Sequence, residues 1–210
     1  GAMLGEVVLA EVTEYKKKMV TAQLLSVVSP SADRIVPQCV QSERCGGCEL
    51  QHCNAEYQLK AKRQIVQDAI TRLGRVDIEV EPVLGMEYPW QYRNKGIFHA
   101  DYSAGNVQLG FYEQGSHSFV PAGNCMLFSN AVNGLVTKLE EMIQNSGKAN
   151  YIHKVMIRES RLNGELMVVF VTEDTAWRLP DLTKAVVAYP NVVSVYHNHN
   201  SNPKLMLGRK

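Results

Sequence analysis

The stretch His153-Lys-Val-Met-Ile-Arg158, followed by Leu162-Asn-Gly164 and Glu165-Leu-Met-Val-Val-Phe-Val171, decides the fold. Two runs rich in β-branched and apolar residues flank an Asn-Gly pair, which accepts positive φ at little cost, so the stretch predicts a β-hairpin. A short helix near residues 181–188 and a strand over residues 192–196 are expected to follow it. This order of elements predicts an α+β fold in which an antiparallel sheet carries helices on one face.

The segment before the hairpin predicts more of the same layer. From Lys95 to Asn124, short strand-like runs alternate with turns at residues 103–106 and 113–115, which indicates an antiparallel meander that leads to Cys125. Ser129 or Asn130 opens a helix that ends at Asn145-Ser-Gly147. We expect its apolar stripe to pack on the sheet, because its members recur at helical spacing. They are Val132, Leu135, Val136, Leu139, Met142 and Ile143.

The N-terminal part of the chain has a different pattern. Residues 7–28 contain β-rich runs separated by the basic turn 16–18, which predicts two or three strands and no complete barrel. The turn-rich segment 29–33 leads from these strands into a group of cysteines. Asn54 is suited to cap a helix that ends at Gly74. The apolar positions of that helix are Leu59, Val66, Ile70 and Leu73.

Composition excludes several classes of protein. The 210 residues are 45% hydrophobic and 20% charged, as in ordinary globular chains, and the formal net charge of +1 gives no chain-wide field for a polyanion. Any nucleic-acid site must therefore be a local patch. No apolar run approaches the roughly 18 residues of a membrane span, and the start does not resemble a signal peptide. We expect a cytoplasmic protein with no membrane partner, in which Gly1-Ala-Met3 is the remnant of a cleaved expression tag.

Five cysteines dominate the chemistry of the sequence. Their odd number and the missing secretion signal favour metal or cluster binding over a disulfide framework. Cys39, Cys45 and Cys48 form a Cys-x5-Cys-x2-Cys motif. Gly46 and Gly47 lie inside it, so unhindered backbone can wrap closely around a metal-bound sulfur.

The identity of the metal centre and of its fourth ligand stays open at this point. Thiolates select zinc or iron–sulfur clusters, and both usually take four ligands, so Cys53 or Cys125 must supply the fourth sulfur. Spacing does not decide between these two cysteines. Zinc sites are more often built from two Cys-x2-Cys pairs, and the single pair here favours a fully ligated cubane cluster. The competing interpretation of Cys53 is a buried small hydrophobe.

One run of residues carries a family resemblance. Cys39-Val-Gln-Ser-Glu-Arg-Cys45-Gly-Gly-Cys48-Glu-Leu-Gln-His52 resembles the cluster segment of the bacterial RNA uracil-5 methyltransferases that modify 23S rRNA. Before it, Ser29-Pro-Ser-Ala-Asp-Arg34 is similar to the end of that family's TRAM domain, a small oligonucleotide-binding-type barrel. Further matches follow the order of the family's central domain, at residues 57–62, 90–95, 109–112, 116–117 and Cys125.

The resemblance implies a domain organisation and a cofactor. Residues 1–36 would hold the tag remnant and the C-terminal part of a TRAM-like β domain, and residues 37–210 an iron–sulfur central domain that handles RNA. By this likeness Cys39, Cys45, Cys48 and Cys125 hold a [4Fe-4S] cluster, and the place of Cys53 is unconstrained. The family transfers a methyl group from S-adenosylmethionine to C5 of a uridine with groups of a C-terminal domain. We expect this chain to stop before that domain, to carry no catalytic residue, to leave S-adenosylmethionine to the longer parent, and to be inactive alone.

The resemblance also implies contacts with 23S rRNA, because a uridine in folded RNA must be unstacked before attack. Basic side chains would contact phosphates, an amide would read a polar edge, and aromatic rings would stack on bases. The competing interpretations are core packing for the aromatic residues, a solvated face for the helical cations, and a capping or surface role for His117. The candidates are Lys60, Arg63, Arg93, Asn94, Lys95, Phe111 and His117, with Phe98 and Tyr112 as further aromatic residues.

Three hypotheses of different classes follow. The favoured one is the iron–sulfur and RNA-binding part of an rRNA methyltransferase, because the resemblance covers nearly the whole chain. The others are a small ferredoxin-like electron carrier and a zinc- or cluster-stabilised nucleic-acid-binding module without enzymatic activity. An electron carrier would be brown with a reversible redox couple, whereas a zinc module would be colourless. No obligate protein partner is inferred.

Overall fold

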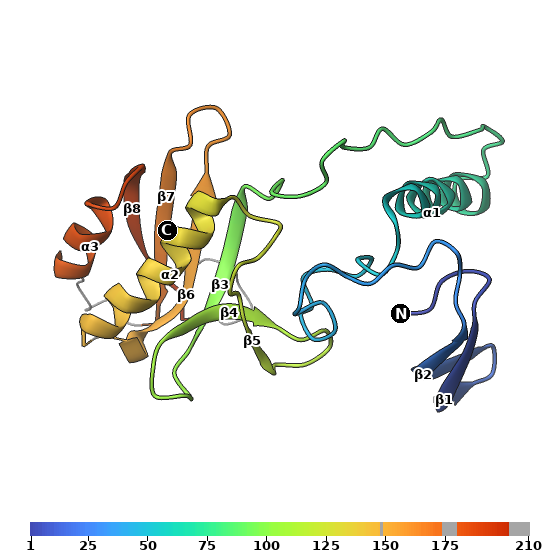
Figure 1. Ribbon diagram of the computed structural model, residues 1–210, viewed down its shortest axis with the longest axis horizontal. Helices are drawn as coiled ribbons and strands as arrows, with labels where there is room; N and C mark the ends of the chain where they lie inside the picture. Colours follow the sequence, from blue (N-terminus) through green and yellow to red (C-terminus); the bar gives the residue numbers. More distant parts are fainter. Residues whose placement is uncertain (148, 174–179, 202–210) are drawn as a thin grey trace. The chain divides into compact units, whose positions relative to one another are not determined.

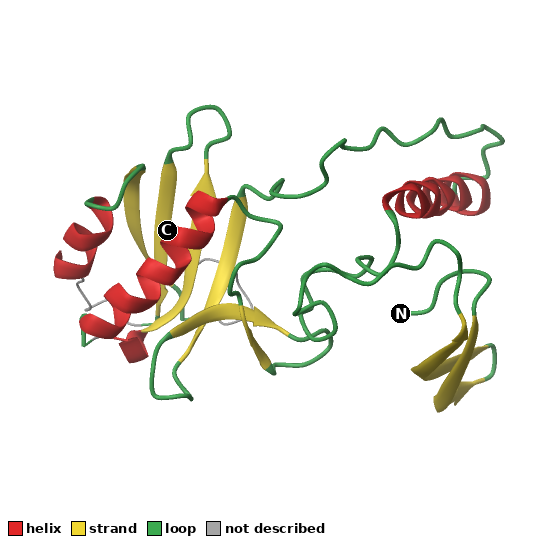
Figure 2. Ribbon diagram, viewed as in Figure 1, coloured by secondary structure: helices red, strands yellow, loops and turns green. Residues whose placement is uncertain are grey.

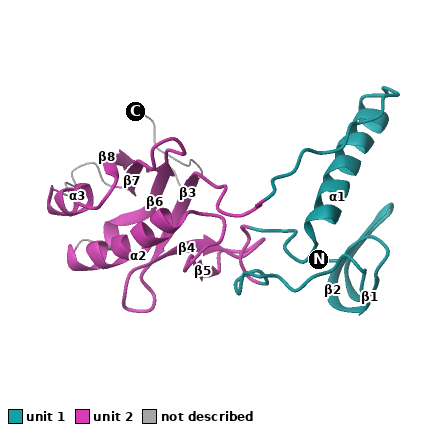
Figure 3. Ribbon diagram, turned by 45° about the horizontal axis from the view of Figure 1, so that its top comes forward, with its two compact units in different colours: residues 1–43, 48–87 teal, residues 44–47, 88–210 magenta. Residues whose placement is uncertain are grey.

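The computed structural model describes residues 1–147, 149–173 and 180–201. The chain forms two compact units (Figure 3). Unit 1 contains residues 1–43 and 48–87, and unit 2 contains residues 44–47 and 88–210. The predicted division at residues 36 and 37 concerns family domains rather than packing, and it stays a prediction. Residues 203–210, whose sequence contains no turn or helix cap that would close a domain, lie outside the described residues.

Unit 2 is built on a six-stranded sheet with helices on one face (Figures 1 and 2). The strand order is β5-β4-β3-β6-β7-β8, so the meander and the hairpin join through the β3–β6 pair. The sequence predictions of an α+β class and of a meander are confirmed here. The strands are β3 (Lys95–Asp101), β4 (Gln108–Tyr112), β5 (Phe119–Pro121), β6 (Ile152–Glu159), β7 (Leu166–Thr172) and β8 (Val192–His199).

The prediction of a purely antiparallel sheet is wrong at its last strand. β8 pairs with β7 in parallel, while every other pair of neighbouring strands in this sheet is antiparallel. The reason is the connection: helix α3 (Pro180–Val187) lies between β7 and β8, and a helical crossover returns the chain to the same end of the sheet. The sheet is therefore mixed.

The central hairpin is confirmed, but its turn differs from the expected form. Only Gly164 of the Asn-Gly pair has positive φ, at 72°. The Ser160 N–H donates to the Glu165 carbonyl at 2.8 Å, which closes a four-residue loop rather than a two-residue one. Longer hairpin loops of this kind need one left-handed residue, and glycine supplies it without steric cost.

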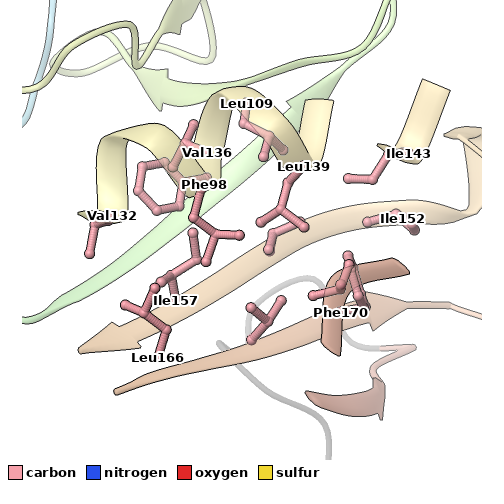
Figure 4. Packing of buried hydrophobic residues seen from close by; sticks show 14 of the residues in the cluster. Phe98, Leu109, Val132, Val136, Leu139, Ile143, Ile152, Ile157, Leu166 and Phe170 are labelled. Atoms are coloured by element: carbon pink, nitrogen blue, oxygen red, sulfur yellow. The ribbon is translucent and has the colours of Figure 1, made fainter. Parts of the chain in front are cut away.

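Helix α2 (Asn130–Asn145) seals the core of unit 2. The Ser129 hydroxyl accepts a hydrogen bond from the Val132 N–H, so the predicted N-cap is confirmed. The predicted stripe faces the sheet: five of its members are buried in the core (Figure 4), and Met142 packs against it in a half-buried position. Two polar side chains of the helix hold the start of β4, because Glu140 accepts the Leu109 N–H at 2.7 Å and Gln144 accepts the Val107 N–H at 2.9 Å.

Unit 1 contains one hairpin and one long helix. β1 (Val7–Lys16) and β2 (Met19–Ser29) form a two-stranded antiparallel sheet. These strands pair only with each other among the described residues, so a partial barrel is not confirmed. Helix α1 (Ala55–Asp68) begins at the predicted cap Asn54, which accepts the Tyr57 N–H, and continues as a π-helical turn, Ala69–Leu73. None of its side chains is buried, so the expected apolar stripe of this helix covers no core.

Hydrogen bonds and an ion pair organise the centre of unit 1. The Arg34 guanidinium contacts the Glu6 carboxylate with Nε at 2.6 Å and Nη2 at 2.8 Å. The same carboxylate accepts the N–H groups of Met3 and Ser31, and Met3 is itself buried. Residues 1–3, assigned to a tag from the sequence, thus take part in the packing of this unit. No helix of the described residues is long and apolar enough to cross a membrane.

Candidate metal-binding cysteines and RNA-facing residues

The loop that carries Cys39 and Cys48 is closed at its base. An isolated β-bridge joins Arg34 to Cys53, and the Ile35 N–H donates to the His52 carbonyl at 2.9 Å. The Cys39 N–H reaches the Gln51 side-chain oxygen at 3.3 Å. Residues 34–35 and 52–53, which flank the cysteine loop, are therefore held together by backbone hydrogen bonds.

Cys53 belongs to the base of this loop. Its exposed fraction is 1%, whereas the other four cysteines are all half-buried. Burial raises the pKa of the Cys53 thiol, although the nearby Arg34 guanidinium opposes the shift. A thiol with a raised pKa is a poorer source of the thiolate that metals bind. The surroundings of Cys53 favour the interpretation as a buried small hydrophobe.

Cys45 lies on the short segment 44–47, which packs with unit 2. Its backbone forms a β-bridge with Glu113, and the Gly46 N–H donates to the Tyr112 carbonyl at 3.0 Å. A Cβ atom at position 46 would lie 2.9 Å from that carbonyl oxygen, so only glycine allows the approach. The Gly47 N–H points to the Cys45 Sγ at 3.4 Å. Such N–H···S contacts are typical of the surroundings of cluster thiolates.

Cys125 lies at the end of the meander, as the sequence predicted. The side chain of Asn133 on α2 fixes its backbone, since Oδ1 accepts the Cys125 N–H at 3.2 Å and Nδ2 donates to the Cys125 carbonyl at 3.1 Å. The Phe128 N–H donates to the same carbonyl at 3.1 Å. Hydrogen bonds within unit 2 thus hold the backbone at two of the predicted ligands, Cys45 and Cys125.

The four predicted ligands divide between the two units. Cys39 and Cys48 belong to unit 1, and Cys45 and Cys125 to unit 2. In the part of the chain that the structure describes, no group of three or more His, Cys, Asp or Glu side chains could hold a metal ion. No disulfide links the five cysteines. The ligand set stays a prediction, and its donor chemistry, four half-buried thiols, fits an iron–sulfur cluster.

Three of the predicted RNA contacts are consecutive residues where the chain enters β3. The Arg93 guanidinium lies 5.8 Å from the centre of the Phe128 ring, and the Arg93 backbone N–H donates to the Leu127 carbonyl at 2.9 Å. The backbone carbonyl of Asn94 accepts the Glu159 N–H at 2.8 Å, and the residue itself is exposed. Lys95 is exposed and lies directly across from Arg158 of β6.

The aromatic candidates divide into two groups on opposite faces of the sheet. Phe98 is buried, and the centre of its ring lies 5.3 Å from that of Phe111 and 5.4 Å from that of Phe128. These three rings pack against α2, which favours the core interpretation of Phe98 and Phe111. On the other face the Tyr112 ring lies 4.1 Å from the His99 ring and 5.4 Å from the exposed ring of His117, measured between centres.

His99 and Lys154 were not singled out by sequence reasoning. Burial lowers the pKa of His99, and the charges of Lys154 and His117 lower it further. Lys154 lies directly across from His99 in the β3–β6 register. Because side chains alternate along a strand, the sequence could have predicted that His99 and Phe98 point to opposite faces of the sheet. The cross-strand register, which brings Lys154 and Tyr112 beside it, cannot be read from one sequence.

The two helical candidates have partners within unit 1. Arg63 donates to the Val80 carbonyl at 2.6 Å and pairs with Glu79 at 2.8 Å, so it fastens the returning segment 78–80 to α1. Lys60 forms an exposed pair with Glu56 one turn away, at 2.7 Å. Arg63 thus has partners within unit 1 and Lys60 lies on a solvated face, while their contact with RNA stays a prediction.

Comparison with known proteins points to one class, the RNA methyltransferases. No protein-family model matches the chain. It is 35% identical over its whole length to an uncharacterized RNA methyltransferase of Clostridium tetani, of which the match covers 48%. It is 32% identical over 93% of its length to one of Listeria monocytogenes (45% of that protein), and 31% identical over its whole length to one of Staphylococcus aureus (49% of that protein).

A solved structure has the same fold over this length. The crystal structure of Pyrococcus abyssi tRNA (uracil-54, C5)-methyltransferase in complex with S-adenosyl-L-homocysteine matches with a TM-score of 0.70 and 25% sequence identity. The match covers 99% of this chain and 48% of that one. The chain spans about half the length of the curated relatives that it matches. This chain is therefore homologous, over nearly its whole length, to a segment that makes up about half of each of these relatives, which are named RNA methyltransferases.

Proposed function

We propose that this chain is the iron–sulfur and RNA-handling portion of an S-adenosylmethionine-dependent RNA uracil-5 methyltransferase, with 23S rRNA as its substrate. The observation that carries the proposal is the homology along the whole chain to proteins named RNA methyltransferases. The solved structure that shares the fold is a uracil C5 methyltransferase and was crystallised with S-adenosyl-L-homocysteine. The choice of 23S rRNA rests on the resemblance of the segment from Cys39 to His52.

The proposed cofactor is a [4Fe-4S] cluster held by Cys39, Cys45, Cys48 and Cys125. Support comes from the half-buried state of these four thiols and from the hydrogen bonds at two of them: Gly47 N–H to the Cys45 sulfur, and the Cys125 N–H to the Asn133 side chain. When bound, a fully ligated cluster would supply strong iron–sulfur bonds that stabilise the fold. The chain's own residues do the rest: Gly46 lets the loop approach Tyr112, and Asn133 holds the Cys125 backbone in place.

The proposed division of labour leaves the methyl transfer to a part of the parent that this chain does not contain. The chemistry needs a thiolate that adds to C6 of the uridine and a base that removes the C5 proton. This half would grip the RNA around the target uridine through phosphates and stacking, which favours an unstacked base. The chain by itself would then transfer no methyl group.

Metal analysis of anaerobically purified protein tests the cofactor. We expect about four irons per chain with matching sulfide and the broad visible absorption of an iron–sulfur protein. Cys125→Ala should lose iron and melt at a lower temperature, because a ligand of the cluster is removed. Cys53→Ala serves as the matched control and should keep its iron. Full iron in Cys125→Ala with loss in Cys53→Ala would refute the ligand set, and one zinc in a colourless protein would establish the zinc module instead.

Methylation by the longer parent protein tests the substrate. Transcripts of 23S rRNA domains and of tRNA are offered with labelled S-adenosylmethionine, and the product is digested to nucleosides. The proposal expects 5-methyluridine in 23S rRNA, none in tRNA, and no product from the 210-residue chain alone. Methylation of tRNA alone would replace the substrate and keep the enzyme class. Methyl transfer by this chain would overturn the division of labour.

A further inference from the structure

Unit 2 has an aromatic cluster on the face of its sheet that lies opposite α2. Four rings belong to it: His99 from β3, Tyr112 from β4, Phe119 from β5, and His117 from the turn between β4 and β5. Tyr112 and Phe119 are direct cross-strand partners, so their side chains share this face. Phe98 directly precedes His99, and Phe111 directly precedes Tyr112, so both face the core instead.

The backbone beneath the cluster is shaped for it. Gly110 lies directly across from His99, and a Cβ at this position would lie 2.6 Å from the Phe119 ring. The missing side chain lets the Phe119 ring lie close over the strand, which fixes one end of the cluster. At the other end His117 is exposed and meets Tyr112 edge to face, with an interplanar angle of 84°. The rings thus form a half-buried group with one exposed end.

Three basic side chains share this face. Lys154 of β6 lies across from His99 of β3. Lys95, four residues before His99 on β3, lies across from Arg158 of β6. Residues at even spacing on a strand point to one side, so all three project on the face of the ring cluster. Among the described residues none of the three forms an ion pair with a carboxylate. In a chain with a net charge of +1, three cations without a carboxylate partner thus share a face with a half-buried ring cluster, of which only His117 is exposed. Met156, which lies between Lys154 and Arg158 on that face, is buried.

We propose that this face of β3, β4 and β6 binds a single-stranded segment of RNA, with an unpaired base stacked on Tyr112 and His117 and phosphates bound by Lys154, Lys95 and Arg158. Stacking rings beside unpaired cations are the arrangement by which sheets bind single strands, because a base offers a π face and its backbone a charge. The inference rests on the proposed function and names the surface that would carry its RNA contact. It replaces Phe111, which faces the core, with Tyr112 as the stacking residue.

Binding of a labelled, uridine-rich single-stranded RNA 12-mer to the full chain tests the inference, with fluorescence anisotropy as the readout. His117→Ala and Tyr112→Leu should each weaken binding about tenfold, since loss of a stacking ring costs that order. Tyr112→Phe should bind like the unmodified chain, because it keeps the ring. Lys154→Gln should lower the slope of log affinity against log salt by about one. His117 is exposed in a turn, so its variant stays informative even where Tyr112→Leu unfolds.

Two matched variants serve as controls. Tyr196→Ala removes a half-exposed ring from β8, the far edge of the same sheet, and Lys138→Gln removes a cation from α2 on the other face. Both should bind RNA normally.

Equal affinity of all variants would overturn the inference and leave the proposed function to the methylation assay of the parent. Displacement by heparin without any effect of His117→Ala would do the same, because it would reduce the contact to charge alone. A full chain that binds no RNA would also overturn the inference, while methylation by the parent decides separately on the enzyme class.

Discussion

The two units of this chain are stabilised by different forces. Unit 2 has a continuous hydrophobic core in which α2 buries five side chains against the sheet. In unit 1 only Met3 and Cys53 are buried apolar residues, and α1 buries none. Hydrogen bonds around Glu6, Arg34 and Asn54 organise unit 1 instead. Amphipathic spacing in a sequence therefore indicates a helix, but it does not indicate a partner for the apolar face of that helix.

The largest expected effect tests the core of unit 2. Leu139→Ala should lower the free energy of unfolding of unit 2 by about 3 kcal/mol, because it leaves a cavity in a fully buried site. Val66→Ala on α1 is the matched change in unit 1 and should stay within about 0.5 kcal/mol, because its side chain is half-exposed. Urea unfolding followed by circular dichroism measures both. Similar losses for the two variants would show that α1 also packs on a core.

The second prediction compares the two helix caps. Ser129→Ala should cost about 1 to 2 kcal/mol, since the hydroxyl accepts the Val132 N–H and also donates to the buried Glu159 carboxylate. Asn54→Ala should cost about 1 kcal/mol, because its side chain caps α1 and donates to Asp33.

Hydrogen exchange of the amides of α2 and α1 separates the two effects. The first variant should speed exchange in unit 2 and the second in unit 1 alone. Faster exchange in both units from either single change would contradict independent stabilisation.

The smallest expected effect is a pH dependence confined to unit 1. The Arg34 guanidinium lowers the pKa of Glu6 from its ordinary 4.5 to about 2, with help from the Met3 and Ser31 amides and against the effect of burial. A lowered pKa means that the pair stabilises unit 1 fully above pH 4.5, and that the effect is lost as the pH falls toward 2.

The chemical shift of the Ser31 amide, followed by NMR against pH, reports this titration. In Arg34→Gln the midpoint should move up toward the ordinary value of a glutamate. An unchanged midpoint would show that the backbone amides, rather than Arg34, hold the carboxylate ionised.

Much of the fold was predictable because local rules decide it. The caps Ser129 and Asn54, the meander and the central hairpin follow from capping chemistry, turn residues and periodicity. The parallel placement of β8 was missed, because strand direction depends on where the crossover helix packs. Helical spacing likewise did not indicate that Leu73 and Val66 are exposed, since burial depends on a partner element elsewhere in the chain.

The candidate site was predictable only in part. The position of Cys125 at the end of the meander could be read from the sequence. The sequence predicted free backbone at Gly46 around a bound metal, but the approach of Gly46 to the Tyr112 carbonyl was found only in the structure. Register decided the rest: it placed Phe111 on the core face and brought His99, Tyr112 and Lys154 to the opposite one. A shift of one residue in either strand pair would exchange these roles.

The cysteine spacing, the helix caps, the positions of the turns and the α+β class were readable from the sequence, because each follows from local patterns along the chain. The type of the central hairpin turn was not. Long-range packing decided that β8 runs parallel to β7, and that α2 covers a core while α1 does not. It also decided which aromatic rings face α2 and which stand beside Lys154 on the opposite face. These outcomes depend on contacts between segments far apart in the chain, whose free energies no local pattern records.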